Sequence, residues 1–183
     1  MHRDLVEAAQ RGDRQAYVDL IRPRSSNLFA IAQRILRDVD RAEDALQDAL
    51  VIAWRDLRGL RDPDRFDAWL RRLLVHECID QASRERRRTS ILRVLPVDGP
   101  AARDELLTVV DRDQLERGFR RLSAEQRTIL VLHHFAGYAP SEIAETLGIP
   151  DGTARSRLHH AHRAMRAALE ADARTSISEG RPA

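Results

Sequence analysis

Hydrophobic residues recur at steps of three and four along most of the chain, the spacing that places them on one face of an α-helix. The clearest case is residues 140–165, PSEIAETLGIPDGTARSRLHHAHRAM, where two apolar stripes flank Gly148 and the pair Ile149-Pro150. A glycine at such a position takes the left-handed backbone conformation that ends a helix. The stripes consist of Ile143, Ala144 and Leu147 before the glycine, and of Ala154, Leu158, Ala161, Met165 and Ala168 after it. This pattern predicts two helices joined by a tight turn.

The outward face of the second predicted helix carries small residues and hydrogen-bond donors near its N-terminus. They are Gly152, Arg155, Ser156, His159, His160 and Arg163. A face of this kind is typical of the recognition helix that a helix-turn-helix protein lays in the DNA major groove. The alternative is an amphipathic hairpin with a solvated basic face. The glycine turn and the small residue at the helix crossing favour DNA binding over that alternative.

The first forty residues predict several shorter helices. Two residue pairs have the spacing of a capping box and are expected to begin helices: Asp4 with Glu7, and Asp40 with Glu43. Gly12 and Asp13 separate the first helix from the second. Pro23 interrupts the apolar pattern, which resumes at Leu28, so we expect either a bent helix or two abutting helices there.

The segment from Asp40 to Leu57 predicts a helix with two different faces. Its apolar face contains Ala42, Leu46, Ala49, Ala53 and Leu57, and its other face carries Glu43, Asp44, Gln47 and Asp48. Like charges four residues apart destabilise an isolated helix slightly, and a basic partner surface would offset that cost. Carboxylates in the first turn are favoured by the helix dipole in any case. The residues alone therefore favour a solvated surface.

A loop and a basic helix follow. Residues 59–64, GLRDPD, are expected to form a loop because of their Gly and Pro content, and Phe66 to Arg88 form a helix that ends in a run of arginines. A basic helix beside an arginine-bearing loop can hold the backbone and bases of a single nucleic-acid strand. We interpret Trp54 and Trp69 instead as part of the core of a helical bundle.

The periodicity is lost between Thr89 and Val110, where two prolines and a glycine mark a domain boundary. Beyond it the pattern predicts a helix over Asp111–Leu122, a capping box of Ser123 with Gln126 at the start of the next helix, and the end of that helix at Gly137. The tail after Asp172 is small and polar and is expected to fray.

The composition narrows the function classes. Of 183 residues, 33% are charged and only 4% aromatic, so a core must be built from aliphatic side chains, which favours small helical domains. All 31 basic residues are arginine, a bias that suits phosphate contacts but that a GC-rich coding sequence explains better. The single cysteine excludes an internal disulfide and a Cys-rich metal site. With no apolar signal core and no membrane-length run, we expect a cytoplasmic protein without membrane insertion.

Neither catalysis nor a metal site is predicted. No nucleophile, paired catalytic carboxylate or glycine-rich phosphate loop is arranged for chemistry, so we expect no enzyme and no cofactor. The histidines lack the paired spacing of a zinc site on one helical face, although His159 and His162 could chelate weakly. Cys78 lies on the apolar side of its helix and is interpreted as a core residue.

Taken in order, these segments resemble the extracytoplasmic-function (ECF) sigma factors, small bacterial factors of the sigma-70 type. The resemblance covers nearly the whole chain and rests on AEDALQDALVIAW (42–54), FDAWLRRL (66–73), and LSAEQRTILVL with EIAETLGIPDGTARSRL (within 122–158). It implies an all-α fold of two small helical domains joined by a flexible linker. The domains are region 2 over residues 1–88, the linker over 89–110, region 4 with its helix-turn-helix over 111–172, and a disordered tail over 173–183.

The resemblance also implies a function, namely binding of core RNA polymerase and promoter-specific initiation of transcription. The face of Glu43, Asp44, Gln47 and Asp48 would dock on the beta-prime clamp, with the beta flap as a further contact. The minus-10 element would be bound and opened by Arg58, Arg61, Asp64, Arg65, Arg72, His76, Asp80 and Arg84. The minus-35 element would be bound by Ser141, Thr153, Arg155, Ser156, His159, His160 and Arg163. An anti-sigma factor is a further implied partner.

Several positions depart from the family's usual residues. His76 stands where asparagine is common, Ala154 replaces a usual valine, and Ala139-Pro140 replaces a usual serine cap. The recognition helix carries His159, His160 and His162 where basic or aromatic residues are commoner, so DNA affinity is expected to rise between about pH 7.5 and about pH 6 as imidazoles gain charge. The competing interpretation is a stand-alone helix-turn-helix transcriptional regulator, which would bind duplex DNA tightly by itself.

Overall fold

The computed structural model describes residues 2–91 and 109–179, and every regular element in those ranges is helical. The chain divides into two compact units, Met1–Ala101 and Ala102–Ala183. This all-α architecture with two helical parts is the one that the sequence predicts. None of the described helices is long and apolar enough to cross a membrane.

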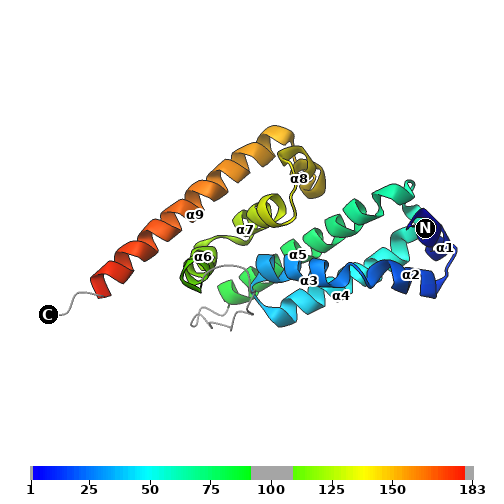
Figure 1. Cartoon of the computed structure of the whole chain (residues 1–183), viewed down its shortest axis with the longest axis horizontal. Helices are drawn as coiled ribbons and strands as arrows, with labels where there is room; N and C mark the ends of the chain where they lie inside the picture. The colour runs from blue at the N-terminus through cyan, green and yellow to red at the C-terminus, as the bar shows by residue number, and fades with distance from the viewer. Residues whose placement is uncertain (1, 92–108, 180–183) are drawn as a thin grey trace. The chain divides into compact units, whose positions relative to one another are not determined.

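The first unit is a helical bundle whose centre is formed by three helices lying side by side (Figure 1). The elements in chain order are α1 (His2–Gln10), α2 (Arg14–Ile21), α3 (Ser25–Leu36), α4 (Val39–Asp56), the 3-10 turns η1 (Leu57–Gly59) and η2 (Pro63–Arg65), and α5 (Phe66–Ile91). Helices α3, α4 and α5 pack against one another, and α1 packs on α2 and on both 3-10 turns. The predicted break at Pro23 is therefore confirmed as a boundary between two helices.

Local capping interactions explain where these helices begin. The Asp13 carboxylate accepts hydrogen bonds from the N–H groups of Gln15 and Ala16 at 2.9 and 3.1 Å, which caps α2. Helix α4 is capped by Asp38, whose extended backbone lets its carboxylate accept from Arg41 N–H at 3.0 Å. The predicted capping box at Asp40 is wrong, because α4 has already begun one residue before it.

The other predicted N-terminal capping box fails for a similar reason. Helix α1 includes His2, so Asp4 lies within its first turn and not at the flanking position that a cap occupies.

A stripe of alanines forms the buried face of α4. Ala42, Ala45, Ala49 and Ala53 are all 0% exposed, and Leu57 continues the stripe at 1%. Small side chains let α3 and α5 approach α4 closely. The sequence pattern placed Leu46 on this face, but Ala45 takes that position and Leu46 is only half-buried. Because Ala45 suits the close approach, the larger leucine is displaced to the flank of the helix.

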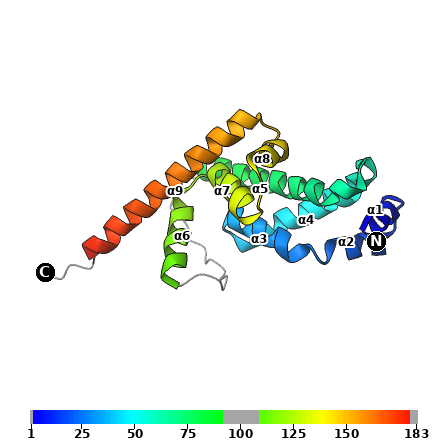
Figure 2. The ribbon, with the colours of Figure 1, turned by 45° about the horizontal axis from the view of Figure 1, so that its top comes forward.

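The second unit is organised around its last helix. Its elements are α6 (Val109–Arg121), α7 (Ala124–Leu130), the π-helical turn η3 (Val131–Phe135), α8 (Pro140–Leu147) and α9 (Asp151–Glu179). Helices α6, α7 and α8 all pack on α9 (Figure 2). At the crossing with α6, a Cβ added to Gly118 would lie 3.0 Å from the Met165 sulfur, so only glycine fits there without a shift.

Two predicted boundary signals in this unit are confirmed. Ser123 and Gln126 form the reciprocal capping box of α7, with hydrogen bonds of 2.9 and 3.2 Å. Gly148 has φ of 64° and ends α8, as its place before the Ile149-Pro150 corner predicts. Ala139 has no capping side chain, but its N–H donates to the Glu142 carboxylate at 2.7 Å. The departure from a serine cap is thus partly compensated.

Helices extend into both the expected linker and the expected tail. Helix α5 continues to Ile91 and α6 begins at Val109, so both ends of the expected 89–110 linker are helical, and 92–108 lies outside the described residues. Helix α9 continues to Glu179, although a disordered tail was expected from residue 173. Neither glycine nor proline occurs between Gly152 and Gly180, so the helix has no local reason to end earlier.

Candidate functional site

The outer face of α4 brings four sequence-predicted residues together. Glu43, Asp44, Gln47 and Asp48 are all exposed along successive turns of the helix. Glu77 and Asp80 of α5 lie close to this face: burial, followed by the charges of Asp48 and Asp80, raises the pKa of Glu77. The concentration of carboxylates across α4 and α5 makes this surface suited to a basic partner.

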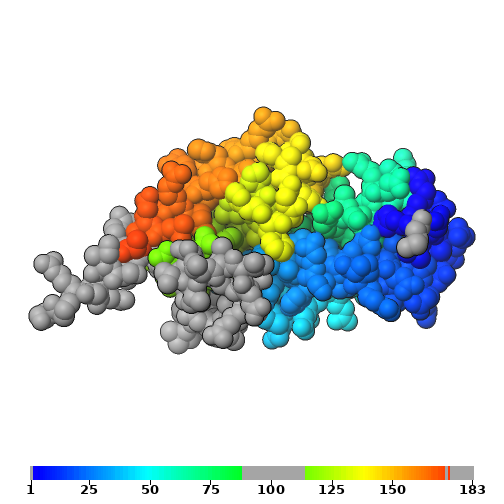
Figure 3. All heavy atoms as spheres, in the orientation of Figure 1, coloured from blue at the N-terminus to red at the C-terminus, as the bar shows by residue number. Residues whose placement is uncertain are grey.

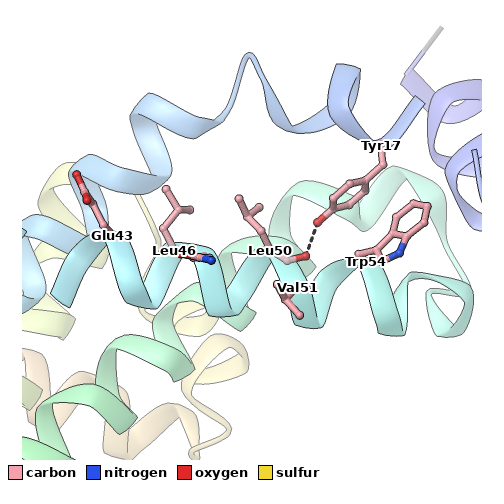
Figure 4. Close-up of a pocket in the computed structure, with 7 residues that line it drawn as sticks. Tyr17, Glu43, Leu46, Leu50, Val51 and Trp54 are labelled. Atoms are coloured by element: carbon pink, nitrogen blue, oxygen red, sulfur yellow. Dashed lines mark hydrogen bonds between the residues drawn. The ribbon is translucent and has the colours of Figure 1, made fainter. Parts of the chain in front are cut away.

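An apolar groove of about 450 Å³ runs beside the acidic face (Figure 4). It is lined by Tyr17, Glu43, Leu46, Gln47, Leu50, Val51 and Trp54, so it shares two residues with the acidic face. Val51 is 61% exposed, which is unusual for a valine on a helix with a fully buried opposite face. The sequence pattern missed this groove because it assigned Leu46 to the buried face and did not single out Leu50 or Val51.

The groove wall is held in place by Tyr17 from α2. Its hydroxyl donates to the Leu50 carbonyl at 2.6 Å, and its ring lies 5.0 Å from the Trp54 ring (Figure 4). Burial raises the pKa of Tyr17 to about 12, so the hydroxyl keeps its proton and its donor role. Trp54 is half-buried against this ring. The indole was predicted to be core, but it also forms part of the groove surface.

The loop between α4 and α5 presents basic side chains. Arg58, Arg61, Asp64 and Arg65 are all exposed in residues 57–65. Asp64 is engaged with Arg3 of α1, and this hydrogen bond lowers the pKa of the carboxyl group. Arg3 was not among the residues that the sequence singled out, because a contact across 61 positions leaves no periodic signal.

The remaining minus-10 candidates lie on α5. Arg72, His76, Asp80 and Arg84 follow one another at steps of four, so they share one side of the helix. Arg72, Asp80 and Arg84 are exposed, and His76 is half-buried. The structure therefore places these four residues as a continuous polar row.

The early turns of α9 expose the predicted recognition residues. Arg155, Ser156, His159, His160 and Arg163 are exposed, whereas Ala154 and Ala161 are 0% exposed on the opposite side. These turns lie at the surface of the second unit (Figure 3). Thr153 is half-buried near the helix start, and Ser141 is exposed in the first turn of α8. Two helix N-termini and an exposed donor face are the features that contact phosphates and base edges.

Histidines from two elements lie close together in the second unit. His162 Nε2 lies 2.7 Å from His134 Nε2 of η3, and the rings of His133 and His134 are 4.7 Å apart. The sequence spacing drew attention to His159 with His162, but His162 instead contacts His134 of a different element. Burial lowers the pKa values of both His134 and His162. In the part of the chain with described side chains, no group of three or more His, Cys, Asp or Glu residues could hold a metal ion.

The single cysteine belongs to the core of the first unit. Cys78 is 0% exposed, and burial raises its thiol pKa to about 12. The sequence interpretation of Cys78 as a core residue is confirmed, and the raised pKa keeps the thiol protonated at neutral pH.

Two helical units, one carrying an acidic face beside an apolar groove and the other a helix-turn-helix, define a two-part DNA-binding protein of the all-α class. Family models agree with this division: Sigma-70 region 2 matches residues 20–88, and Sigma-70 region 4 matches residues 112–165. The ECF RNA polymerase sigma factor SigM of Mycobacterium tuberculosis is 32% identical over 156 residues, covering 84% of this chain and 77% of SigM. The chain belongs to the ECF sigma factor family.

Solved structures support the same family assignment. The sigma factor RpoE of Bartonella quintana, solved with the anti-sigma factor NepR, is 25% identical with a TM-score of 0.68, covering 87% of this chain and 98% of that one. CnrH, solved with the cytosolic domain of CnrY, is 26% identical with a TM-score of 0.64, covering 93% of this chain and 98% of that one.

Proposed function

We propose that this chain binds core RNA polymerase and directs it to promoters, with residues 1–88 acting as region 2, 111–172 as region 4 and 89–110 as the connecting linker. One observation carries the proposal. A single chain presents an acidic face beside an apolar groove on α4 and a row of exposed donors on α9, in segments that match the two sigma regions. A stand-alone DNA-binding regulator has no need of the first surface.

The α4 surface is the core polymerase contact. A helical partner that lays apolar side chains in the groove and basic side chains over Glu43, Asp44, Gln47 and Asp48 satisfies both parts of this surface at once. The resemblance to the family indicates the beta-prime clamp helices as that partner, with the beta flap as a further contact. Electrostatic attraction speeds the encounter, and the apolar groove slows dissociation.

Residues 57–65 and α5 bind the minus-10 element. Arg58 and Arg61 hold phosphates or an unstacked base at the loop, where Asp64 and Arg65 also lie. The row of Arg72, His76, Asp80 and Arg84 on α5 gives the single strand a path. A base that leaves the duplex stack exposes its hydrogen-bonding edges to such a loop. The loop can then recognise the base in a single strand.

The α9 face binds the minus-35 element. Arg155, Ser156, His159, His160 and Arg163 face the major groove, and Ser141 and Thr153 near two helix N-termini bind the flanking phosphates. His162 takes no part in base contacts because its ring is turned to His134.

Three further parts of the proposal follow from this role. The chain performs no chemistry of its own, because the polymerase supplies catalysis. It acts in the cytoplasm, where the polymerase is. An anti-sigma factor regulates it by covering the acidic and apolar α4 surface; the likeness to RpoE solved with NepR supports such a partner.

The test is co-elution with bacterial core RNA polymerase on a sizing column. The wild-type chain is expected to co-elute, and Asp44→Arg with Asp48→Arg is expected to abolish it. Glu125→Arg with Glu170→Arg is the matched control, because it changes the net charge equally through exposed residues of the other unit. Tight duplex binding by the free wild-type chain without co-elution would instead identify a stand-alone regulator.

A further inference from the structure

Gln10, the last residue of α1, holds the loop that connects α4 to α5. Its side-chain Nε2 donates to the Leu57 carbonyl at 3.0 Å and to the Leu60 carbonyl at 2.8 Å. These two carbonyls bracket the exposed residues Arg58 and Gly59. The side chain of Gln10 is half-buried, so the two hydrogen bonds are partly shielded from competing water.

The other end of the same loop is also tied to α1. Arg3 forms ion pairs with Asp64 and, at 3.9 Å, with Asp62. Asp62 in turn accepts from the N–H of Asp64 at 3.1 Å and so begins the η2 turn. Both 3-10 turns of the loop therefore have a contact to one short helix, η1 through Gln10 and η2 through Arg3.

The start of α1 is anchored in the helical bundle. The Phe66 ring, at the start of α5, is 0% exposed and lies 6.0 Å from the His2 ring. The Arg24 guanidinium lies 5.6 Å from the centre of the same ring and 3.1 Å from His2 Nδ1. Helix α1 is thus fixed to α3 and α5 at its start and reaches the loop with its last residue.

Each 3-10 turn of the loop is closed by a backbone hydrogen bond, from the Leu60 N–H to the Leu57 carbonyl and from the Arg65 N–H to the Asp62 carbonyl. Leu60 is half-buried, and its flanking residues Gly59 and Arg61 are exposed. The Gln10 amide therefore adds a link from α1 to the η1 turn, beside the burial of Leu57 at the end of α4.

We propose that Gln10 is a positioning residue for minus-10 recognition, and that α1 acts as a brace that holds residues 57–65 in the shape that receives an unstacked base. This inference rests on the proposed function. A loop held in advance loses little conformational entropy on binding, and a displacement of about 1 Å is enough to weaken a positioned contact severely. Gln10 does not touch DNA in this proposal and acts only through the loop.

The test compares base preferences of polymerase holoenzymes. Promoters are selected from a library randomised at the minus-10 and minus-35 elements, using core polymerase with wild-type chain, Gln10→Glu or Gln10→Lys. Gln10→Glu keeps the size but replaces the donor with an acceptor, which repels both carbonyls. Gln10→Lys keeps a donor and tests rescue. Gln15→Glu is the matched control, because its amide donates to Asp19 at 3.1 Å, away from the loop.

We expect Gln10→Glu to lower the preference for the best minus-10 base by about tenfold while leaving minus-35 preferences and core affinity unchanged. Gln10→Lys is expected to restore most of the preference, and Gln15→Glu to match wild type. A general loss of stability would weaken core binding and all preferences together, so it would not imitate this pattern. Unchanged minus-10 preferences in Gln10→Glu would overturn the proposal.

A second variant guards against failure of Gln10→Glu to fold. Arg3→Gln removes an exposed ion pair at the other end of the brace and is expected to lower minus-10 preference by a smaller factor. If Gln10→Glu does not fold, minus-10 preferences in Arg3→Gln that equal those of wild type would overturn the proposal. A wild-type holoenzyme that selects no promoter at all would overturn the proposed function itself. This outcome is seen in the wild-type sample alone, so it cannot be confused with a result from either variant.

Discussion

Helix α4 in the first unit and helix α9 in the second are both packed through alanines. Ala42, Ala45, Ala49 and Ala53 on α4 are 0% exposed, as are Ala154 and Ala161 on α9. Their outward faces are opposite in charge: α4 presents carboxylates beside an apolar groove, and α9 presents arginines and histidines. The buried faces determine how neighbouring helices approach, and the exposed faces determine which partner each helix can bind.

The largest effect is expected from shortening the main aliphatic side chain of the α9 stripe. Leu158 is 8% exposed, and Leu158→Ala should lower the free energy of unfolding by about 2–5 kcal/mol. His159→Ala, one residue further along the exposed face, should change it by less than about 0.5 kcal/mol. Denaturant unfolding of the full chain measures both. A wild-type unfolding curve for Leu158→Ala would show that this residue does not support the helix packing.

The α4 stripe should be sensitive to added volume. Ala49→Leu inserts a large side chain where α3 and α5 pack on α4, and it should cost about 1–3 kcal/mol of unfolding free energy. Val51→Leu, on the exposed side of the same helix, is the control and should be nearly neutral. If both variants unfold alike, the alanines are not the reason for the close helix approach.

The charged face of α9 is tested by base discrimination. Arg155→Ala should lose roughly 1–3 kcal/mol of discrimination at one minus-35 base pair. Arg157→Ala removes the same charge from an exposed position outside the proposed recognition row and should lower affinity without changing base preference. Binding of the polymerase holoenzyme with each variant to single-base variants of a selected promoter separates the two. Equal base preference in Arg155→Ala and wild type would contradict the assigned register of α9.

The smallest effect is a pH dependence from the His134 and His162 pair. Burial lowers both pKa values below the ordinary 6.5, so the unfolded chain takes up protons first as pH falls. Stability is therefore complete above about pH 6.5 and declines as pH falls toward the lowered folded pKa values. The charge of His133 lowers both pKa values further, and the charges of His159 and Arg166 also lower that of His162.

Melting temperatures at pH 7.5 and pH 5.5 check this expectation. His134→Gln with His162→Gln should reduce the decline. His159→Gln with His160→Gln keeps the contact between His134 and His162 and should leave more of the decline in place. A decline of the same size in the first double variant as in wild type would show that the 2.7 Å pair is not its source.

The sequence predicted the parts of this molecule that depend on local pattern. Helix periodicity, the turn at Gly148 and the capping box of Ser123 with Gln126 all depend on neighbours within a few residues, and the structure confirms them. Asp38 was missed as a cap because Asp40 fits the capping box motif better, although the backbone is extended only at Asp38.

The sequence pattern could not predict contacts between segments that are distant in the chain. The apolar groove exists because Ala45 takes the buried position and leaves Leu46 and Leu50 on the flank, which depends on how closely α3 and α5 approach. The contact between His134 and His162 spans 28 positions, and that between Gln10 and Leu57 spans 47. Neither has a periodic signal, because each depends on tertiary packing and not on helix geometry.

In the proposed function, α4 binds polymerase and α9 binds promoter DNA. A photo-crosslinking amino acid at Val51, which is 61% exposed in the groove, or at His159, on the exposed face of α9, tests both halves in one holoenzyme–promoter complex. We expect position 51 to crosslink to the beta-prime subunit and position 159 to minus-35 DNA. Crosslinking of position 51 to DNA alone, or of neither position to its expected partner, would contradict this account.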